Sequence, residues 1–490
     1  MRKKDLKYWI AGAILVIIFM AATFPYIIAK SRFESLKAEL REQGEPVTFR
    51  EYVDKYYKPI PDEDNAVGVL NEAFALYKGP DANCSNIIWG DADKTRFDQK
   101  TSPLQLPYVK AFMKANRSSL DKLQELKNYD SLRFEINSIE LLDVVYENID
   151  KLSDAAKLYA LKMELLIYEA KPQEAEKLLK EMFHLAGLAI QTVPVAHITY
   201  SYSCENIALD ALERSMNTLS FSSEQLKFFQ ELCEAQELVV VKNYPYDAKR
   251  IIYFQLDIAS FQGLVSLDFY PYESNEYINR LPLNLRQSFY YYSGSYFNDL
   301  STEIKAFKSI MNVPVDCYAK RKSELEKIDY EYRQTSSPSF GPCYADYLRI
   351  MDILSRLRSA ATACAVERYR LKYGNLPKDL NALVPEFMDK VPVDPFDGNQ
   401  LRYFRGVFEL ECRVAFPDKM KKAKWAAKTS HSGFCLGIYN RGFEYKTVNS
   451  KKTGYHVYSV GWNLIDDKSL KFDGQPYPED IGFLVIDKKQ

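Results

Sequence analysis

An apolar run near the N-terminus constrains this chain more than any other feature. Residues Tyr8 to Ala29 include no charged side chain. A helix needs roughly 20 apolar residues to cross the hydrocarbon core of a bilayer, where each unpaired backbone amide costs several kcal/mol. The run therefore predicts an N-terminal transmembrane helix that contacts the membrane through residues 8–29.

Basic residues precede this run, and they favour an N-terminus held in the cytoplasm. They are Arg2, Lys3, Lys4 and Lys7. We expect a single-pass protein of the cell (inner) membrane whose body is extracytoplasmic, that is, periplasmic. A cleaved signal peptide is the alternative, but its apolar core is shorter and its cleavage site needs small residues, whereas Ile27 occupies the upstream position before Ala29. Both interpretations export the body of the protein.

Composition limits the classes of function. The chain has 490 residues, enough for two or three domains with cores of their own. Its 65 Lys and Arg residues nearly balance its 66 Asp and Glu residues, so the sequence lacks the excess of basic residues typical of a nucleic-acid-binding protein. The sequence contains no GxSxG, HExxH or P-loop motif. We therefore assign no catalytic residue and consider an enzyme the less favoured interpretation.

The cysteines leave two interpretations open. Their even number fits an oxidising compartment with disulfides, although connectivity cannot be deduced from spacing. Buried free thiols fit equally well, because cysteine packs like a small hydrophobic residue. The eight residues are Cys84, Cys204, Cys233, Cys317, Cys343, Cys364, Cys412 and Cys435.

Helical periodicity dominates the middle of the chain, from residue 105 to 373. Leu158, Leu161 and Leu165 recur at helical spacing, and Pro172 suits the first turn of a following helix. This pair is similar to one tetratricopeptide unit, but no second copy follows at a spacing of about 34 residues. We therefore predict a helical bundle or an irregular solenoid.

The pattern changes after Gly374, where prolines and short alternating runs predict a small antiparallel sheet. The runs are Leu401–Tyr403, Phe434–Tyr439, Tyr455–Val460 and Phe483–Ile486. A long helix from Ala345 to Tyr373 leads into the sheet.

The predicted fold is therefore mainly α, with three parts. Residues 1–31 form the cytoplasmic tip and the anchor. Residues 32–340 form an extracytoplasmic helical domain, and residues 341–490 form the long helix with a small α+β module.

The C-terminal part contains motifs that recur in a known family. They are Tyr373-Gly374-Asn375-Leu376-Pro377, the stretch from Val391 to Gly398, Leu401-Arg402-Tyr403 and Tyr458-Ser459-Val460-Gly461. In order and character this region resembles the globular domain of type II secretion major pseudopilins, which are type IV pilin-like. The resemblance implies a long helix that feeds a short sheet. Gly374 then suits a helix C-cap, and Asp394-Pro395 and Asp397-Gly398 suit turns.

The chain also departs from the pseudopilin pattern. The resemblance covers residues 360–405 and 455–486, and we expect residues 406–454 to interrupt the sheet. The anchor lies far upstream and lacks a prepilin processing site, so assembly into a fibre is not expected. As a whole, the chain resembles membrane-anchored exported proteins of planctomycete and verrucomicrobial type, which share a stretch similar to Pro59–Ala66.

The pseudopilin resemblance implies a calcium site in the loop after the Tyr-Ser-x-Gly strand end. Asp466, Asp467 and Asp480 are the candidate ligands, since calcium takes six to eight oxygen ligands. Lys468 and Lys471 lie in the same loop. A solvated acidic loop, with aspartates that form turns, is therefore the favoured alternative.

A zinc site is the second metal hypothesis. Cys412, His431 and Cys435 could supply three ligands and His456 a fourth, but their spacing matches no closed zinc motif. An incidental grouping, or a disulfide between Cys412 and Cys435, is the favoured alternative.

Together these features predict a membrane-anchored extracytoplasmic binding or scaffold protein of the cell envelope. It would have a protein partner and a link to secretion or surface assembly. The alternative is a membrane-tethered hydrolase that acts on envelope polymers, which would require carboxyl groups converging around an aromatic cleft.

Overall fold

The fold was analysed in a computed structural model of residues 1–490. It describes the backbone of residues 3–48, 51, 54–55, 58, 60–79, 106–134, 141–191, 202–261, 293–333, 344–422, 441–466 and 480–488. Side chains are described for these residues except 3–22, 141–149, 244–261, 307, 311, 346, 409–422 and 441–450. The sequence also predicts a long loop at residues 78–104, rich in Gly, Pro, Asp, Asn and Ser, and a helix interruption at residues 265–297. Both lie largely outside the described ranges.

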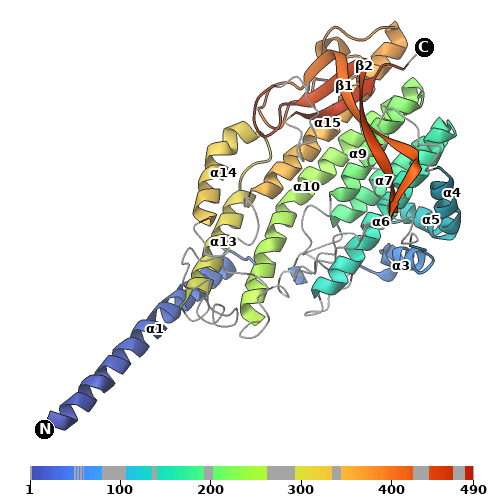
Figure 1. The fold of residues 1–490 in the computed structure, drawn as a ribbon. Coiled ribbons are helices and arrows are strands. Elements are labelled where there is room, and N and C mark those ends of the chain that lie inside the picture. The colour runs from blue at the N-terminus through green and yellow to red at the C-terminus, as the bar shows by residue number, and fades with distance from the viewer. Residues whose placement is uncertain are drawn as a thin grey trace. The chain divides into compact units, whose positions relative to one another are not determined.

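The described residues confirm a mainly helical chain with a small antiparallel sheet (Figure 1). Their α-helices are α1 (Lys3–Glu42), α3 (Val67–Ala75), α4 (Leu106–Ala115), α5 (Arg117–Leu123), α6 (Leu141–Tyr168), α7 (Pro172–Gln191), α9 (Ser203–Thr218), α10 (Ser223–Phe261), α13 (Ser295–Met311), α14 (Tyr318–Tyr332) and α15 (Ala345–Tyr373). α7 begins at Pro172 and α15 has the predicted bounds.

The chain divides into two compact units that alternate along the sequence. Unit 1 comprises residues 1–58, 245–314 and 321–346, and unit 2 comprises 59–244, 315–320 and 347–490. The domain boundaries predicted after residues 31 and 340 remain predictions.

In unit 1, the C-terminal half of α1 packs against α13 through aromatic rings. The Phe297 ring lies 5.6 Å from that of Tyr26 and 5.7 Å from that of Phe33, measured between centroids. Ala29 and Phe33 are each only 2% exposed. Offset and edge-on aromatic pairs of this kind stabilise a fold by about 0.5–1.5 kcal/mol beyond the contribution of the surface area that they bury.

Gly294 permits the close approach of α13 to α1. It precedes α13 with a φ of 82°, a left-handed conformation that favours glycine. A Cβ atom at this position would lie 2.8 Å from the carbonyl oxygen of Pro25 and 2.9 Å from the Cβ of Ala29. Any larger residue would therefore force α13 away from α1.

Among the residues whose side chains are described, no helix combines the length and the apolar character needed to span a bilayer. The side chains of residues 1–22 lie outside that set.

In unit 2, the helices α6, α7 and α9 pack against one another in pairs. Their apolar residues form the core, with Leu161, Leu179 and Leu212 at most 2% exposed. One ion pair lies within this core, between Glu164 of α6 and Arg214 of α9. Removing one partner of such a buried pair costs about 3–5 kcal/mol, because the other charge stays buried.

The sheet of unit 2 contains β1 (Arg402–Lys422), β2 (Arg441–Ser459) and β3 (Ile481–Ile486), antiparallel in the order β1-β2-β3. The hydroxyl of Tyr455 in β2 donates to the Ala363 carbonyl at 3.2 Å and to Glu367 at 2.8 Å, which fixes the sheet on α15.

The expectation that residues 406–454 interrupt the sheet was wrong. Within that segment the described residues extend β1 to Lys422 and begin β2 at Arg441, with continuous pairing apart from one register shift after Phe416. The segment includes many aromatic and β-branched residues, which favour strands. The predicted run Phe434–Tyr439 lies outside the described residues.

Candidate functional site

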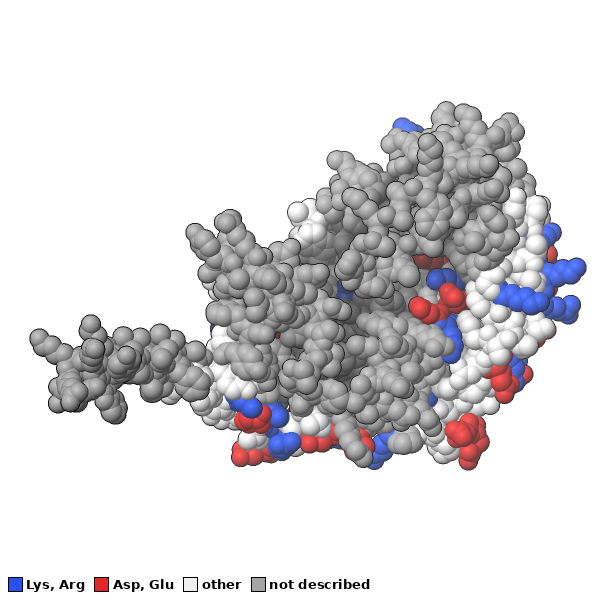
Figure 2. All heavy atoms as spheres, turned by 60° about the horizontal axis from the view of Figure 1, so that its bottom comes forward, with Lys and Arg blue, Asp and Glu red and all other residues white. Residues whose placement is uncertain are grey.

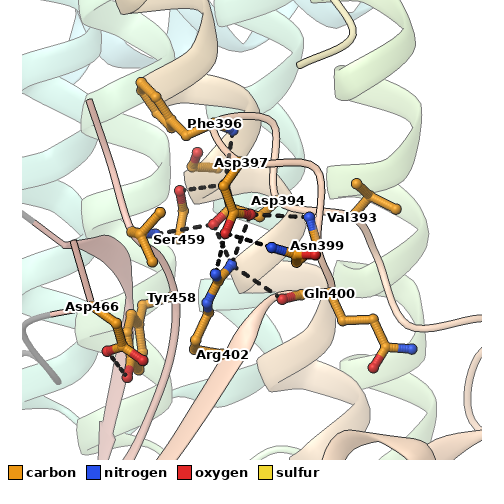
Figure 3. Close-up of polar contacts among 12 residues, drawn as sticks. Val393, Asp394, Phe396, Asp397, Asn399, Gln400, Arg402, Tyr458, Ser459 and Asp466 are labelled. Carbon is orange, nitrogen blue, oxygen red and sulfur yellow. Dashed lines mark hydrogen bonds and ion pairs between the residues drawn. The ribbon is translucent and has the colours of Figure 1, made fainter. Parts of the chain in front are cut away.

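Asp394 lies at the centre of a polar cluster that joins the turns before β1 to the end of β2 (Figure 3). Its carboxylate is fully buried and accepts hydrogen bonds from Phe396 N at 2.8 Å, Ser459 Oγ at 2.6 Å and Val460 N at 3.0 Å. The aspartate before Pro395 thus ties its own turn to the end of β2. Burial raises the pKa of Asp394, although these three donors oppose the shift.

Arg402, at the start of β1, supplies the positive charge for this cluster. Its guanidinium donates to Asp394 at 2.8 Å and to Asp397 at 3.0 Å (Figure 3). Burial alone would raise the pKa of Asp397, but hydrogen bonds from Arg402 and Asn399 bring it below its usual value. The Asp397 carboxylate in turn raises the pKa of Arg402. A guanidinium therefore occupies the position that acidic residues would otherwise offer to a cation.

The loop after β2 is braced on this cluster. The Tyr458 hydroxyl donates to Asp466 at 2.9 Å, and Leu464 N donates to the Gly461 carbonyl. Leu464 has a φ of 62°, which is uncommon and unfavourable for a residue other than glycine. Strain of this kind persists only where surrounding contacts fix the backbone, so the loop has a defined conformation.

This loop presents apolar side chains to solvent. Trp462 is 48% exposed and Ile465 is 58% exposed, and Val393, next to Asp394, is 42% exposed. Exposed aromatic residues on a rigid support are typical of binding surfaces, where tryptophan is enriched among the residues that dominate affinity.

The predicted calcium ligands are placed only in part. Asp466 accepts the Tyr458 hydroxyl, and Asp480 is 7% exposed just before β3, whereas Asp467 lies outside the described residues. Among the side chains that are described, no group of three or more metal-binding residues occurs. The calcium interpretation remains untested.

The predicted zinc ligands are also largely outside the described part. His431, Cys435 and the side chain of Cys412 are not among the described residues. His456 is buried in β2, and its ring stacks on the Tyr458 ring with the two centroids 4.9 Å apart. Burial lowers the pKa of His456 to about 3, so this side chain is neutral at physiological pH. Of the cysteines that are described, Cys204, Cys233, Cys317 and Cys364 are buried free thiols.

A second polar cluster, which the sequence did not reveal, joins α9 to α15 and α10. Arg356 of α15 donates to Asn206 at 2.7 Å and also pairs with Asp210. Glu205 is fully buried and accepts a hydrogen bond from Gln236 of α10 at 2.6 Å. These contacts connect three helices through charged groups within unit 2.

Three buried carboxyl groups that interact with Arg356 have raised pKa values: those of Glu205, Glu213 and Asp352. Burial raises the pKa of Glu205 to about 8, against the opposing effects of Gln236 and Arg356. Burial likewise raises the pKa of Glu213 to about 7, with Arg356 and the Leu484 amide opposing. The pKa of Asp352 is also about 7, since burial outweighs Arg356 and Arg349.

These raised pKa values predict that stability falls with rising pH. An unfolded chain releases the Glu205 proton near the ordinary pKa of 4.5, whereas the folded chain keeps it until the pKa of about 8. The free energy of unfolding should therefore decrease by about 2 kcal/mol between about pH 6.5 and pH 8 from this group alone. His456 has a lowered pKa, and its opposing contribution changes mainly below pH 6.5, the ordinary pKa of histidine.

Urea denaturation of the detergent-solubilised chain at both pH values measures this difference. The variant Glu205→Gln should lose the share of the pH dependence that comes from this group, about 2 kcal/mol, and should keep the share from Glu213 and Asp352. Equal wild-type stability at the two pH values would show that Glu205 titrates normally.

Comparisons with known proteins add no relative to this description. No protein-family model, curated protein or solved structure matches the chain. The assignment of a function therefore depends on the geometry described above.

Proposed function

We propose that this chain is a membrane-anchored extracytoplasmic binding or scaffold protein of the cell envelope. The observation that carries the binding role is the loop of residues 461–466. It exposes Trp462 and Ile465 and is braced through Tyr458 and Asp466. A rigid loop loses little conformational entropy when it binds, so its apolar side chains contribute more to affinity.

Several features support the membrane anchor. The apolar run Tyr8–Ala29 belongs to α1, which continues without interruption to Glu42. Phe24 and Ile27, at the end of the run, are 62% and 58% exposed, and the Lys30 ammonium lies 5.6 Å from the centre of the Tyr26 ring. Exposed apolar side chains followed by aromatic and basic ones are typical of the boundary between lipid and water.

The pseudopilin-like motifs support a link to secretion or surface assembly. The turns at Asp394 and Asp397 and the C-cap at Gly374 have the expected local conformation. We propose that this module presents the 461–466 loop to a protein partner in the envelope. No nucleic-acid partner is proposed, because acidic and basic side chains are mixed over the described surface in Figure 2.

Site-specific photocrosslinking tests the binding role. A photoreactive phenylalanine derivative replaces Trp462 in the full-length chain in cells, and a matched variant carries it at Leu371, which is 56% exposed on α15. We expect a discrete adduct with one envelope protein from position 462 only. Identical adduct patterns from both positions, or none from 462, would refute the role of the loop.

Protease treatment of intact and lysed cells tests the anchor independently. We expect residues 45–490 to be cleaved from the outer side of the cell membrane in intact spheroplasts, with the chain recovered in the membrane fraction. A body that is protected until lysis would refute the topology while leaving the crosslinking result interpretable.

The α9–α15 cluster is the observation that favours the alternative, a tethered hydrolase. A carboxyl group protonated near neutral pH is what a general acid requires. However, Glu213 already accepts the Leu484 amide and Asp210 is paired with Arg356. Because these contacts hold the fold together, we favour the binding role.

A further inference from the structure

The two edge strands of the sheet, β3 and β1, differ in how the rest of unit 2 contacts them. At the β3 edge, the Asn217 side chain of α9 donates to the Leu484 carbonyl at 2.8 Å and accepts from Ile486 N at 2.7 Å. Glu213, one turn earlier on α9, accepts from Leu484 N at 2.7 Å. Side chains of a helix thus replace a fourth strand and close this edge.

The same bonds define which backbone groups face outward at the β1 edge. The backbone groups of Leu484 and Ile486 that bond to α9 point away from β2. The residues of β3 that alternate with them therefore bond to β2, and their partners in β2 are at the odd-numbered positions. The bond from Asp487 N to the Thr453 carbonyl agrees with this alternation. The even-numbered positions of β2 therefore bond to β1. The outward groups of β1 belong to Tyr403, Arg405 and Val407.

Among the described residues, the outer edge of β1 is covered at its beginning. Leu401 N donates to the Pro392 carbonyl at 3.1 Å, as the alternation requires. Beyond this point no strand in the described part of the chain pairs with β1 on that side. β2 in turn pairs with β3 only from Gly454 to Ser459, so the hairpin continues as two strands. A two-stranded hairpin alone is marginally stable in water.

We propose that the outer edge of β1 pairs antiparallel with the β1 edge of a second copy of this chain, centred on Val407. This pairing would join two three-stranded sheets into one six-stranded sheet. Val407 is 51% exposed, an apolar side chain on an edge strand between the charged residues Arg405 and Glu409. In the proposed dimer the two Val407 residues face each other across a two-fold axis.

Charge complementarity favours this register over one centred on Glu409. Centring on Val407 places Arg405 of each copy opposite Glu409 of the other, so two oppositely charged pairs form. If the pairing were centred on Glu409 instead, Arg405 of each copy would lie opposite Arg413 of the other, and the two Glu409 residues would lie opposite each other. All of these pairs would have like charges. Opposite charges directly across strands stabilise a sheet and like charges destabilise it.

Oxidative crosslinking of the full-length chain in detergent micelles tests the contact. The variant Val407→Cys should form a disulfide-linked dimer under mild oxidation, because Cα atoms of facing residues lie about 5.5 Å apart. Thr453→Cys is the matched control: Thr453 is exposed and pairs with Val407 across β1 and β2, but it lies one strand further from the proposed axis. Crosslinking of both variants, of neither, or to a different protein would overturn the proposal.

Two further variants test the register without new thiols. Val407→Pro removes only an outward N–H, so it should keep the β1–β2 pairing and yield monomers in mass photometry, whereas Val407→Thr should remain dimeric. Arg405→Glu and Glu409→Arg should each weaken the dimer about tenfold, and the double variant should restore it. Dimers unaffected by Val407→Pro, or no rescue in the double variant, would contradict the β1 pairing.

Discussion

Replacing Asp394 by alanine should lower the free energy of unfolding by about 4 kcal/mol. The substitution removes the acceptor for Phe396 N, Ser459 Oγ and Val460 N within a buried site. It also leaves the Arg402 guanidinium with Asp397 as its remaining carboxylate partner. Each buried donor left without an acceptor costs about 1–3 kcal/mol.

Urea denaturation of the detergent-solubilised variant, followed by circular dichroism, measures this loss. Asp397→Asn is the matched control, because Asp397 contacts the same arginine from a less buried position. We expect that control to cost about 1 kcal/mol. If Asp394→Ala is no more destabilising than Asp397→Asn, the buried carboxylate does not organise the turn.

Replacing Asn217 by leucine should cost about 3 kcal/mol and should loosen β3 in particular. Leucine has a similar size but neither donates to the Leu484 carbonyl nor accepts from Ile486 N. Both backbone groups lie at a buried edge, so water cannot easily replace the amide. Hydrogen exchange of the β3 amides should accelerate more than that of the α9 amides.

Thr218→Val is the control for this second prediction. Thr218 neighbours Asn217 on α9, but its hydroxyl bonds back to the Arg214 carbonyl within the same helix. We expect a cost below about 1 kcal/mol and no selective change at β3. Equal exchange rates at β3 in Asn217→Leu and wild type would show that Asn217 does not hold this strand.

Local signals in the sequence were sufficient for much of the fold. Pro172 and Gly374 indicated where α7 begins and where α15 ends, because proline suits a first helical turn and glycine adopts the left-handed conformation after a last one. The aspartates before Pro395 and Gly398 formed the expected turns. These features depend on neighbours in sequence, so single residues reveal them.

Contacts between distant segments were not predictable in the same way. Asn217 and Leu484 are far apart in sequence, and nothing in either segment indicates that an α9 side chain would close a sheet edge. The same holds for Glu205 and Arg356, whose partners lie on other helices. The length of β1 and β2 was underestimated, because the resemblance to a shorter sheet suggested an insertion.

The polar cluster around Asp394 was not predicted as a site. The acidic residues expected to bind a cation, Asp466, Asp467 and Asp480, follow the Tyr-Ser-x-Gly strand end, and that calcium site stays a prediction. Asp394 and Asp397 lie before β1, where Arg402 neutralises them within the chain. Arg402 lies eight positions after Asp394. No local sequence pattern distinguishes it from an ordinary surface arginine, so its pairing with Asp394 was not predicted.

Because α1 is one continuous helix, it limits how far unit 1 could lie from a membrane. If the apolar run ends at the bilayer surface near Ala29, the remaining residues to Glu42 rise about 1.5 Å each, or roughly 20 Å in all. Because Ala29 and Phe33 are buried where α1 packs on α13, no slack tether would then separate unit 1 from the lipid. Anything that binds unit 1 would have to approach the bilayer itself.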